Sequence, residues 1–233
     1  MFRRRSNKTM MGAVVLAASV GAMFVTQFVQ VAAQERPALL FQETWQQAEE
    51  ALGIPMSDHR SDNMYYLAGQ SAVTNDALEL GLYGDRSGDV TAYAHEGRID
   101  LWTGLVGSPV AVTLKHRGSY LDLTGLARVR ATVRTNNLHV LHPVVKLPDG
   151  TLLVGSQTIG TNGEFLVTEV AFGNQRWFNL DPDEVASGSE VTAPDLSRVD
   201  EVGFTDLAPA GGHGNAGWVN ISTVEVYATA VAR

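Results

Sequence analysis

Short apolar runs, separated by polar stretches rich in Gly, Asn, Asp and Pro, follow one another along most of the chain. The apolar residues do not recur at the spacing of three and four positions that marks an amphipathic helix. Short runs bounded by turn-forming residues predict the β-strands of an antiparallel sandwich or barrel. The runs cover residues 37–45, 77–83, 99–102, 110–115, 127–134, 138–147, 152–154, 165–172, 199–205 and 219–228. Residues 46–52 are compatible with one or two helical turns, which Gly53 and Pro55 would end.

Two segments carry the strongest strand signals. Residues 127–134, ARVRATVR, alternate apolar and polar positions throughout, and a period of two places one face against a core and the other in solvent. Further along, Pro148-Asp149-Gly150 separates two runs rich in β-branched residues. Proline presets the turn dihedral and glycine accepts a positive φ, so this segment predicts a β-hairpin.

The segments DLTGLARV (122–129) and DLSRVDEV (195–202) resemble each other. In both, an Asp carboxylate can accept hydrogen bonds from N–H groups that follow it, which forms a tight turn before a strand. Their flanks differ, so we interpret them as equivalent corners of one sandwich and not as a tandem repeat.

The N-terminal 33 residues have the order of a secretory signal peptide. A basic patch that includes Arg3 and Lys8 precedes an uncharged stretch, residues 10–31, and Val31-Ala32-Ala33 offers small residues before a cleavage point. The alternative is an uncleaved anchor, because about 20 apolar residues suffice to span a bilayer. We expect cleavage and export to the periplasm or the extracellular space, which leaves residues 34–233 as a single domain without a membrane contact.

The charge of residues 34–233 restricts the possible partners. They hold 13 Lys and Arg against 25 Asp and Glu, a net charge of −12. Phosphate backbones and anionic lipid surfaces would repel such a chain, so we expect no nucleic-acid partner. The chain has no cysteine, which excludes disulfides, thiolate metal sites and a cysteine nucleophile.

A G-x-G-x-x-G pattern occurs at residues 212–217. A dinucleotide-binding turn requires a helix after this pattern and an acidic residue about 20 positions further on. Here a β-branched run follows, and only 16 residues remain after Gly217. The pattern therefore belongs to a glycine-rich loop.

Several strings together resemble the galactose-binding-like jelly rolls, the β-sandwich of many carbohydrate-binding modules. They are LWTG, VTL, DLTGLARVR, PVVKLPDGTLLVG, RWFNLD, DLSRVDEVGFTDL and GGHG, and they span roughly residues 39–228. They are most similar to those of a group of exported bacterial proteins, for which the resemblance carries no established catalytic residues. It implies an antiparallel two-sheet jelly roll and export.

Sugar binding requires flat aromatic faces and fixed polar groups. Trp102 and Trp177 lie at borders between loops and strands, and the loop 209–218 places further candidates among four glycines: His213, Asn215 and Trp218. Glycines allow a backbone to approach a ligand closely, although they also form tight turns. One polar strand face carries three arginines that could bind a carboxylate-bearing sugar or pair with neighbouring acids: Arg128, Arg130 and Arg134.

Calcium is a further expectation. The first and last strands of a jelly roll usually pair, which would bring Glu43 near Glu225, and carboxylates with backbone carbonyls suit this cation. The alternative is that both side chains face solvent.

The predicted function is non-catalytic binding of an extracellular glycan or a cell-envelope component, with calcium as a possible stabilising ion. One alternative is a glycan-degrading enzyme, a glycoside hydrolase or lyase. No two acidic residues lie two positions apart in a convincing strand, the spacing that would place a catalytic pair on one face. The other alternative is a structural protein that interacts with the envelope.

Overall fold

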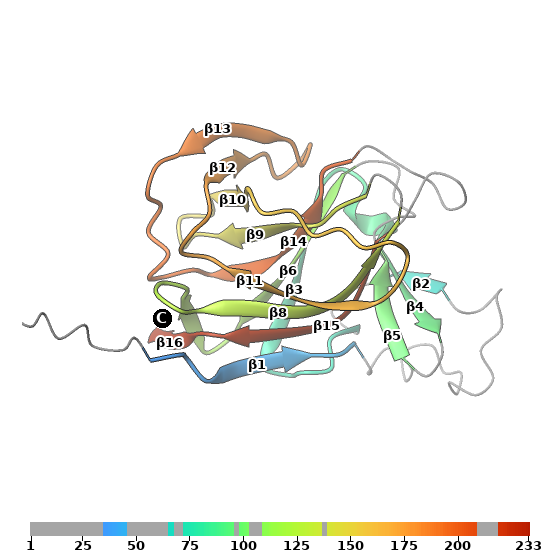
Figure 1. Cartoon of the computed structure of the whole chain (residues 1–233), viewed down its shortest axis with the longest axis horizontal. Coiled ribbons are helices and arrows are strands. Elements are labelled where there is room, and N and C mark those ends of the chain that lie inside the picture. The colour runs from blue at the N-terminus through green and yellow to red at the C-terminus, as the bar shows by residue number, and fades with distance from the viewer. Residues whose placement is uncertain are drawn as a thin grey trace, which may run out of the picture. The chain divides into compact units, whose positions relative to one another are not determined.

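The computed structural model describes residues 35–45, 65–67, 72–95, 98–102, 109–136, 139–208 and 219–233. These residues belong to one unit, which spans Gln34–Arg233. Its strands form two seven-stranded antiparallel sheets and a two-stranded sheet (Figure 1). Across the described ranges no helix is long and apolar enough to cross a membrane. The predicted signal peptide and the predicted helical turns at 46–52 lie outside the described residues.

Sheet A has the strand order β11-β8-β15-β5-β4-β2, and β1 pairs with β15. The first strand thus lies beside a late strand of the chain, as the jelly-roll pattern predicts. The bounds of its strands are β1 (Leu39–Glu43), β2 (Tyr65–Leu67), β4 (Thr91–His95), β5 (Arg98–Trp102), β8 (Arg128–Thr135), β11 (Leu166–Ala171) and β15 (Val219–Tyr227).

Sheet B has the order β13-β12-β10-β9-β14-β6-β3. Its strands are β3 (Leu78–Tyr83), β6 (Val110–His116), β9 (His142–Lys146), β10 (Leu152–Gly155), β12 (Trp177–Leu180), β13 (Ser187–Val191) and β14 (Glu201–Asp206). The small third sheet pairs β7 (Ser119–Asp122) with β16 (Thr229–Ala232), and a short 3₁₀ helix, η3 (Ser87–Asp89), follows β3.

The core contains side chains from both large sheets. Val129 and Val133 of sheet A belong to one buried cluster with Val112 and Phe204 of sheet B. In β8 the alternating pattern appears as predicted, because Val129, Ala131 and Val133 are buried while the polar residues between them, Arg130 and Thr132, are not. The antiparallel sandwich predicted from the sequence is confirmed.

The predicted turns also form. In the β9–β10 hairpin, Gly150 has φ of 93° and the Asp149 carboxylate accepts a 2.9 Å hydrogen bond from the Thr151 N–H. In the two corners, Asp122 accepts from the N–H of Thr124 and Asp195 from that of Ser197, each at 2.9 Å. The corners are neighbours, because the N–H of Leu123 donates to the carbonyl of Leu196 over 2.8 Å.

Sheet B also carries apolar side chains on its outer face, the face opposite the core. Six buried residues pack together there: Ala111, Val144, Leu152, Val154, Leu180 and Val185. Val185 lies in the turn between β12 and β13 and has φ of 49°, a strained conformation for a β-branched residue. This turn is held against the end of β3, because the N–H of Gly84 donates to the carbonyl of Pro182 over 2.8 Å.

Candidate functional site

A pocket of about 230 Å³ lies beside strands β12 and β13. Among its walls are Trp177, one of the residues predicted to bind sugar, and Phe172. The two rings are stacked, with centroids 6.1 Å apart and planes 3° from parallel. Because Trp177 is only 2% exposed, it forms part of the pocket wall and is not the open platform that was predicted.

The pocket also contains an exposed ion pair. Arg176 Nε lies 3.0 Å from Glu190 Oε1, and Nη2 lies 2.7 Å from Oε2, so the pair is bidentate. The Arg176 guanidinium also lies over the ring of Phe178, 5.2 Å from its centroid. The hydrogen bond from Arg176 lowers the pKa of Glu190, and the hydrogen bond to Glu190 raises the pKa of Arg176. Both groups therefore stay charged at ordinary pH, with a donor and an acceptor side by side.

The three predicted arginines share the outer face of sheet A, but each has partners in the protein. Arg128 lies 3.1 Å from Glu169 and over the ring of Tyr227. Arg130 lies 3.6 Å from Glu225.

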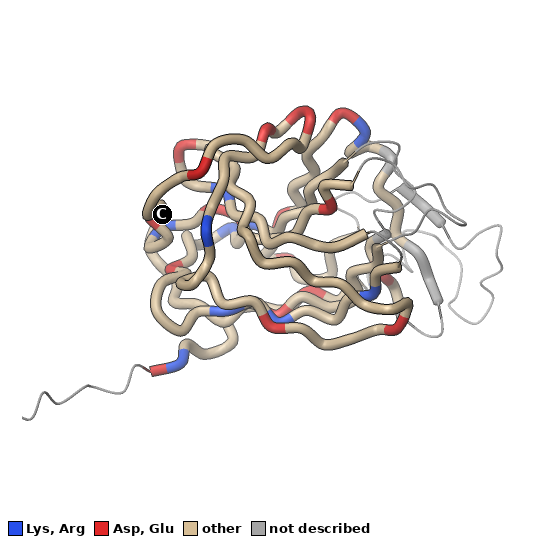
Figure 2. Tube along the Cα trace, turned by 45° about the horizontal axis from the view of Figure 1, so that its top comes forward, with Lys and Arg blue, Asp and Glu red and all other residues tan. Residues whose placement is uncertain are grey.

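Arg134 donates to Asn220 Oδ1 through Nε and Nη2, each over 3.3 Å. Along the described part of the chain, basic positions are interspersed with acidic ones (Figure 2). Each of the three arginines therefore has a partner within the protein, and together they do not form an open anion site.

At one end of this face a row of residues crosses four strands. Thr91 of β4 pairs with Trp102 of β5, Trp102 pairs with Asn220 of β15, and Asn220 pairs with Arg134 of β8. Asn220 is fully buried and Thr91 is 9% exposed. The hydroxyl of Thr91 and the amide Nδ2 of Asn220 are buried without a hydrogen-bond partner. Two of the predicted residues, Arg134 and (by its backbone register) Trp102, thus share a row with two unsatisfied polar groups.

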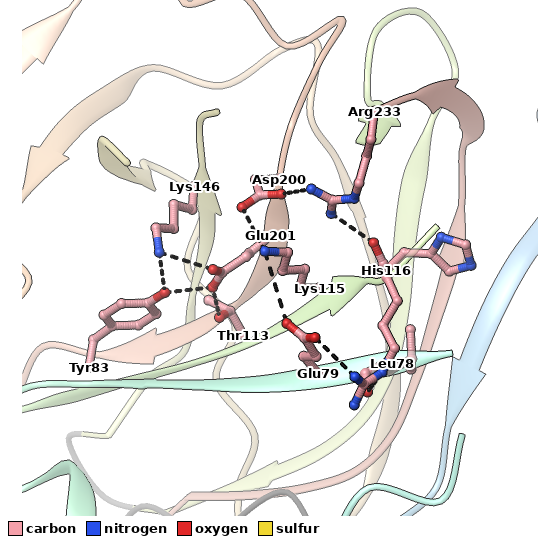
Figure 3. Close-up of polar contacts among 11 residues, drawn as sticks. Leu78, Glu79, Tyr83, Thr113, Lys115, His116, Lys146, Asp200, Glu201 and Arg233 are labelled. Atoms are coloured by element: carbon pink, nitrogen blue, oxygen red, sulfur yellow. Dashed lines mark hydrogen bonds and ion pairs between the residues drawn. The ribbon is translucent and has the colours of Figure 1, made fainter. Parts of the chain in front are cut away.

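A second polar cluster lies on the outer face of sheet B (Figure 3). Glu201 of β14 is 5% exposed and accepts three hydrogen bonds from side chains. Tyr83 donates to its carboxylate over 2.7 Å, Lys146 donates over 3.1 Å, and Thr113 donates to the same oxygen as Tyr83. Lys146 also donates to the Tyr83 oxygen over 2.8 Å. Every member of this cluster has a partner within it.

The cluster shifts the titration of two members. Burial alone lowers the pKa of Lys146, but hydrogen bonds to Tyr83 and Glu201 and the negative charge of Glu201 outweigh it and raise the pKa to about 12. Burial, with the hydrogen bond to Glu201, raises the pKa of Tyr83 against the opposing effect of Lys146. Lys146 remains a cation and Tyr83 a neutral phenol at physiological pH, which suits a structural cross-link between strands.

Glycine at position 81 makes room for this cluster. A Cβ at Gly81 would lie 2.6 Å from Glu201 Oε2 and even closer to the Thr113 hydroxyl. Both groups are buried and hydrogen-bonded, so they have little freedom to move away.

The predicted calcium ligands, Glu43 and Glu225, are not brought together. In the β1–β15 pairing Gln42 lies opposite Glu225, while Glu43 lies opposite Val224. Residues directly opposite share a face and neighbours in a strand alternate, so the two carboxylates are on opposite faces of the sheet.

Each carboxylate has other partners. Glu43 is 1% exposed and accepts four backbone N–H groups, from Thr44, Trp45, Thr74 and Asn75, over 2.6–3.0 Å. Glu225 accepts from the Tyr227 hydroxyl over 2.9 Å. Within the described ranges no three His, Cys, Asp or Glu residues form a group that could hold a metal ion. We therefore assign no metal to this pair.

Three predicted residues, His213, Asn215 and Trp218, lie outside the described residues, as does the side chain of Trp102. Sequence reasoning missed Arg176, Glu190, Thr91 and Asn220. The pairing of Phe178 with Glu190 across β12 and β13 brings Glu190 beside Arg176. No local pattern in the sequence marks this register.

No family model matches the chain, and no curated protein matches it. Two solved structures of family 11 carbohydrate-binding modules from Clostridium thermocellum are similar to it. One, from a cellulosomal cellulase, has 10% identity and a TM-score of 0.37, covering 71% of this chain and 86% of the module. The other, in complex with a β-1,3-1,4-mixed-linked tetrasaccharide, has 9% identity and a TM-score of 0.35. It covers 77% of this chain and 96% of the module.

An exo-β-agarase is similar at 10% identity and a TM-score of 0.36, over 73% of this chain and 25% of the agarase. Because all three TM-scores are low, the function proposed below rests on residues of this chain.

Proposed function

We propose that this protein is an exported, non-catalytic domain that binds a neutral polysaccharide through the pocket beside β12 and β13. The observation that carries the proposal is the bidentate Arg176–Glu190 pair in the wall of a pocket that also contains Trp177. An arginine and a carboxylate held side by side present adjacent donors and acceptors, which match neighbouring hydroxyls of a sugar ring.

The size of the pocket fits one sugar ring. Pockets that enclose drug-sized ligands measure about 300–1,000 Å³, and this one measures about 230 Å³. A single sugar ring, either at the end of a polysaccharide or exposed along it, suits this volume.

The charges favour a neutral sugar over a uronate. A sugar carboxylate would have to displace Glu190 from Arg176 and would leave Glu190 without its partner. The net charge of −12 on residues 34–233 adds a general repulsion for polyanions. The arginines of β8, the other candidate for binding a uronate, already have partners within the protein.

The number of carboxylates in the pocket wall supports binding without catalysis. Glycoside hydrolysis generally uses two carboxylates about 5–10 Å apart. Among the described residues in the pocket wall, Glu190 is the single carboxylate. Export to the periplasm or the extracellular space is proposed from the basic, apolar and small-residue order of residues 1–33.

The test is affinity electrophoresis of the purified protein in gels that contain a neutral glucan, a galactan, alginate or polygalacturonate. We expect retardation in one of the neutral gels and about tenfold or more weaker binding for Arg176→Ala and for Glu190→Gln, since each loses charge-assisted hydrogen bonds.

Arg117→Ala is the matched control. Arg117 forms an ion pair of similar exposure with Glu79, 3.0 Å apart, away from the pocket. Equal retardation of Arg176→Ala and Arg117→Ala would reject the pocket, and release of sugars from a retarding polysaccharide would reject a purely binding role.

A further inference from the structure

Gln175 lies in the wall of the pocket beside β12 and β13, next to Arg176. The residue is half-buried, and both ends of its amide have a partner. Oε1 accepts from the backbone N–H of Gln157 over 3.3 Å, and Nε2 donates to the carbonyl of Ala171 over 3.0 Å. A flipped amide would place donor against donor and acceptor against acceptor. The two backbone partners therefore fix both the position and the orientation of the amide.

Glycine at position 155 leaves room for this amide. Gly155 lies opposite Trp177 in the β10–β12 pairing. A Cβ at position 155 would overlap Gln175 Oε1 and would lie 2.8 Å from Pro143 Cγ. Because the amide is the end of a flexible side chain, a larger residue at position 155 would displace it from its backbone partners. Gly155 is therefore a positioning residue for Gln175.

The amide of Gln175 has hydrogen-bonding capacity beyond these two bonds. An amide carries two N–H donors, and its oxygen has two lone pairs. Among the described residues, each end of the amide has one partner. One N–H and one lone pair therefore remain on a fixed, uncharged group in the pocket wall.

We infer that Gln175 contacts the ligand and determines the specificity of this pocket. Its remaining N–H donates to one hydroxyl oxygen of the bound ring, and its remaining lone pair accepts from another hydroxyl. The inference rests on the proposed function and narrows the ligand to an unmodified neutral sugar ring. Such a ring has hydroxyls for Gln175 beyond those that Arg176 and Glu190 bind. A carboxylate or sulfate in this place would bring acceptors against Oε1, and a methyl ether could not donate to it.

The test uses two variants, their combination and one matched control. Gln175→Ala removes the amide, while Gly155→Ala keeps the amide but displaces it. Asn179→Ala is the control, because its amide donates to Ser189 Oγ over 3.0 Å between the same two strands and lies outside the pocket wall. Retardation is measured in gels of the neutral polysaccharide that retards the wild type.

We expect Gln175→Ala to weaken retardation by roughly twofold to tenfold, the effect of one neutral hydrogen bond. Gly155→Ala should weaken it by a similar factor. The double variant should bind no more weakly than Gln175→Ala, because both substitutions remove the same contact and their effects do not add. Asn179→Ala should bind normally.

NMR spectroscopy separates ligand contact from a purely structural role. In ¹⁵N-labelled wild-type protein, the side-chain NH₂ signals of Gln175 and Asn179 are assigned by their absence in the two alanine variants. An oligosaccharide prepared from the retarding polysaccharide is then added up to saturation. We expect the Gln175 signals to shift and the Asn179 signals to stay in place. This measurement uses the wild-type fold, so a variant that folds poorly does not affect it.

The possible outcomes separate this inference from the proposed function. Normal retardation of Gln175→Ala beside a loss in Arg176→Ala would overturn the role of Gln175 alone, and so would Gln175 signals that do not move at saturation. A further loss in the double variant would overturn the claim that Gly155 acts through Gln175. A wild-type protein that no polysaccharide retards would overturn the proposed function and this inference together.

Discussion

The outer faces of the two sheets each carry a buried polar cluster, but the clusters differ in how far their hydrogen bonds are completed. On sheet B, Glu201 accepts from Tyr83, Thr113 and Lys146, and the members satisfy one another. On sheet A, Thr91 and Asn220 are comparably buried, yet each retains a polar atom without a partner. Burial and polarity alone therefore do not show whether the hydrogen bonds of a polar cluster are complete.

Glu43, a predicted calcium ligand, shows again that burial and residue type alone do not identify the role of a polar group. Its buried carboxylate had the residue type and strand position expected of a calcium ligand, but four backbone N–H groups occupy it. These bonds tie the end of β1 to residues 74 and 75. A buried carboxylate that already accepts several hydrogen bonds from its own chain has a structural role.

The largest expected effect comes from breaking the completed cluster. Glu201→Ala leaves the hydroxyls of Thr113 and Tyr83 without their acceptor and the Lys146 ammonium without its counter-charge. Removing one partner of a buried ion pair costs about 3–5 kcal/mol, and because the Lys146 side chain is 24% exposed we expect the lower end, about 3 kcal/mol. Urea unfolding measures the loss, and polysaccharide retardation should not change.

Glu79→Ala is the control for this variant, because its side chain is 43% exposed and its ion pair with Arg117 is a surface pair. Such pairs contribute about 0–1 kcal/mol. Equal losses in the two variants would contradict the structural importance of the Glu201 cluster.

A smaller effect is expected from high pH. The folded-state pKa of Lys146 is about 12, above its ordinary 10.5. Stabilisation by a group with a raised folded-state pKa is fully present below the unfolded value and is lost as the pH rises through the folded value. The raised pKa of Tyr83 acts in the same direction.

The measurement is the melting temperature of the wild type and of Lys146→Met from pH 8 to pH 12. The difference in melting temperature between the wild type and Lys146→Met should be largest at pH 8 and should decrease between about pH 10.5 and 12. A difference that stays constant across this range would show that the charge of Lys146 does not contribute to stability.

The smallest expected effect concerns the β9–β10 hairpin, which belongs to neither cluster. Asp149→Ala removes the carboxylate that accepts from the Thr151 N–H, and we expect the melting temperature to fall by about 2 °C or less. This hydrogen bond also lowers the pKa of Asp149 below 3.8. The effect should therefore disappear as the pH falls below that pKa, and retardation should be normal at neutral pH.

The parts of the fold that the sequence predicted are those with local signals. The alternation in residues 127–134 became β8, Pro148-Asp149-Gly150 became a hairpin turn, and the two Asp corners formed as expected. Each signal lies within a few residues and needs no knowledge of distant partners.

Strands without such signals were missed or misjudged. Strand β13, with the sequence SGSEV, has four exposed residues out of five and no apolar alternation. The run 138–147 was expected to be one strand, but β9 begins only at His142.

The sites depend on register between distant strands, which explains why sequence reasoning placed them poorly. Trp177 was expected on a platform but lies in the wall of the pocket, and the pair Arg176–Glu190 forms only when β12 and β13 align. The Glu201 cluster likewise joins residues from β3, β6, β9 and β14. No single segment carries enough information to predict these contacts.

The most direct test of the contrast between completed and incomplete clusters is the same substitution made once on each sheet. The free energies of unfolding of Thr91→Val and Thr113→Val would be measured in urea beside the wild type. We expect Thr113→Val to lose about 1–2 kcal/mol, because it breaks a buried hydrogen bond to a carboxylate, and Thr91→Val to lose nothing or to gain up to about 1 kcal/mol. An equal loss in both variants would contradict the account, because the Thr91 hydroxyl would then have a stabilising partner in the free protein.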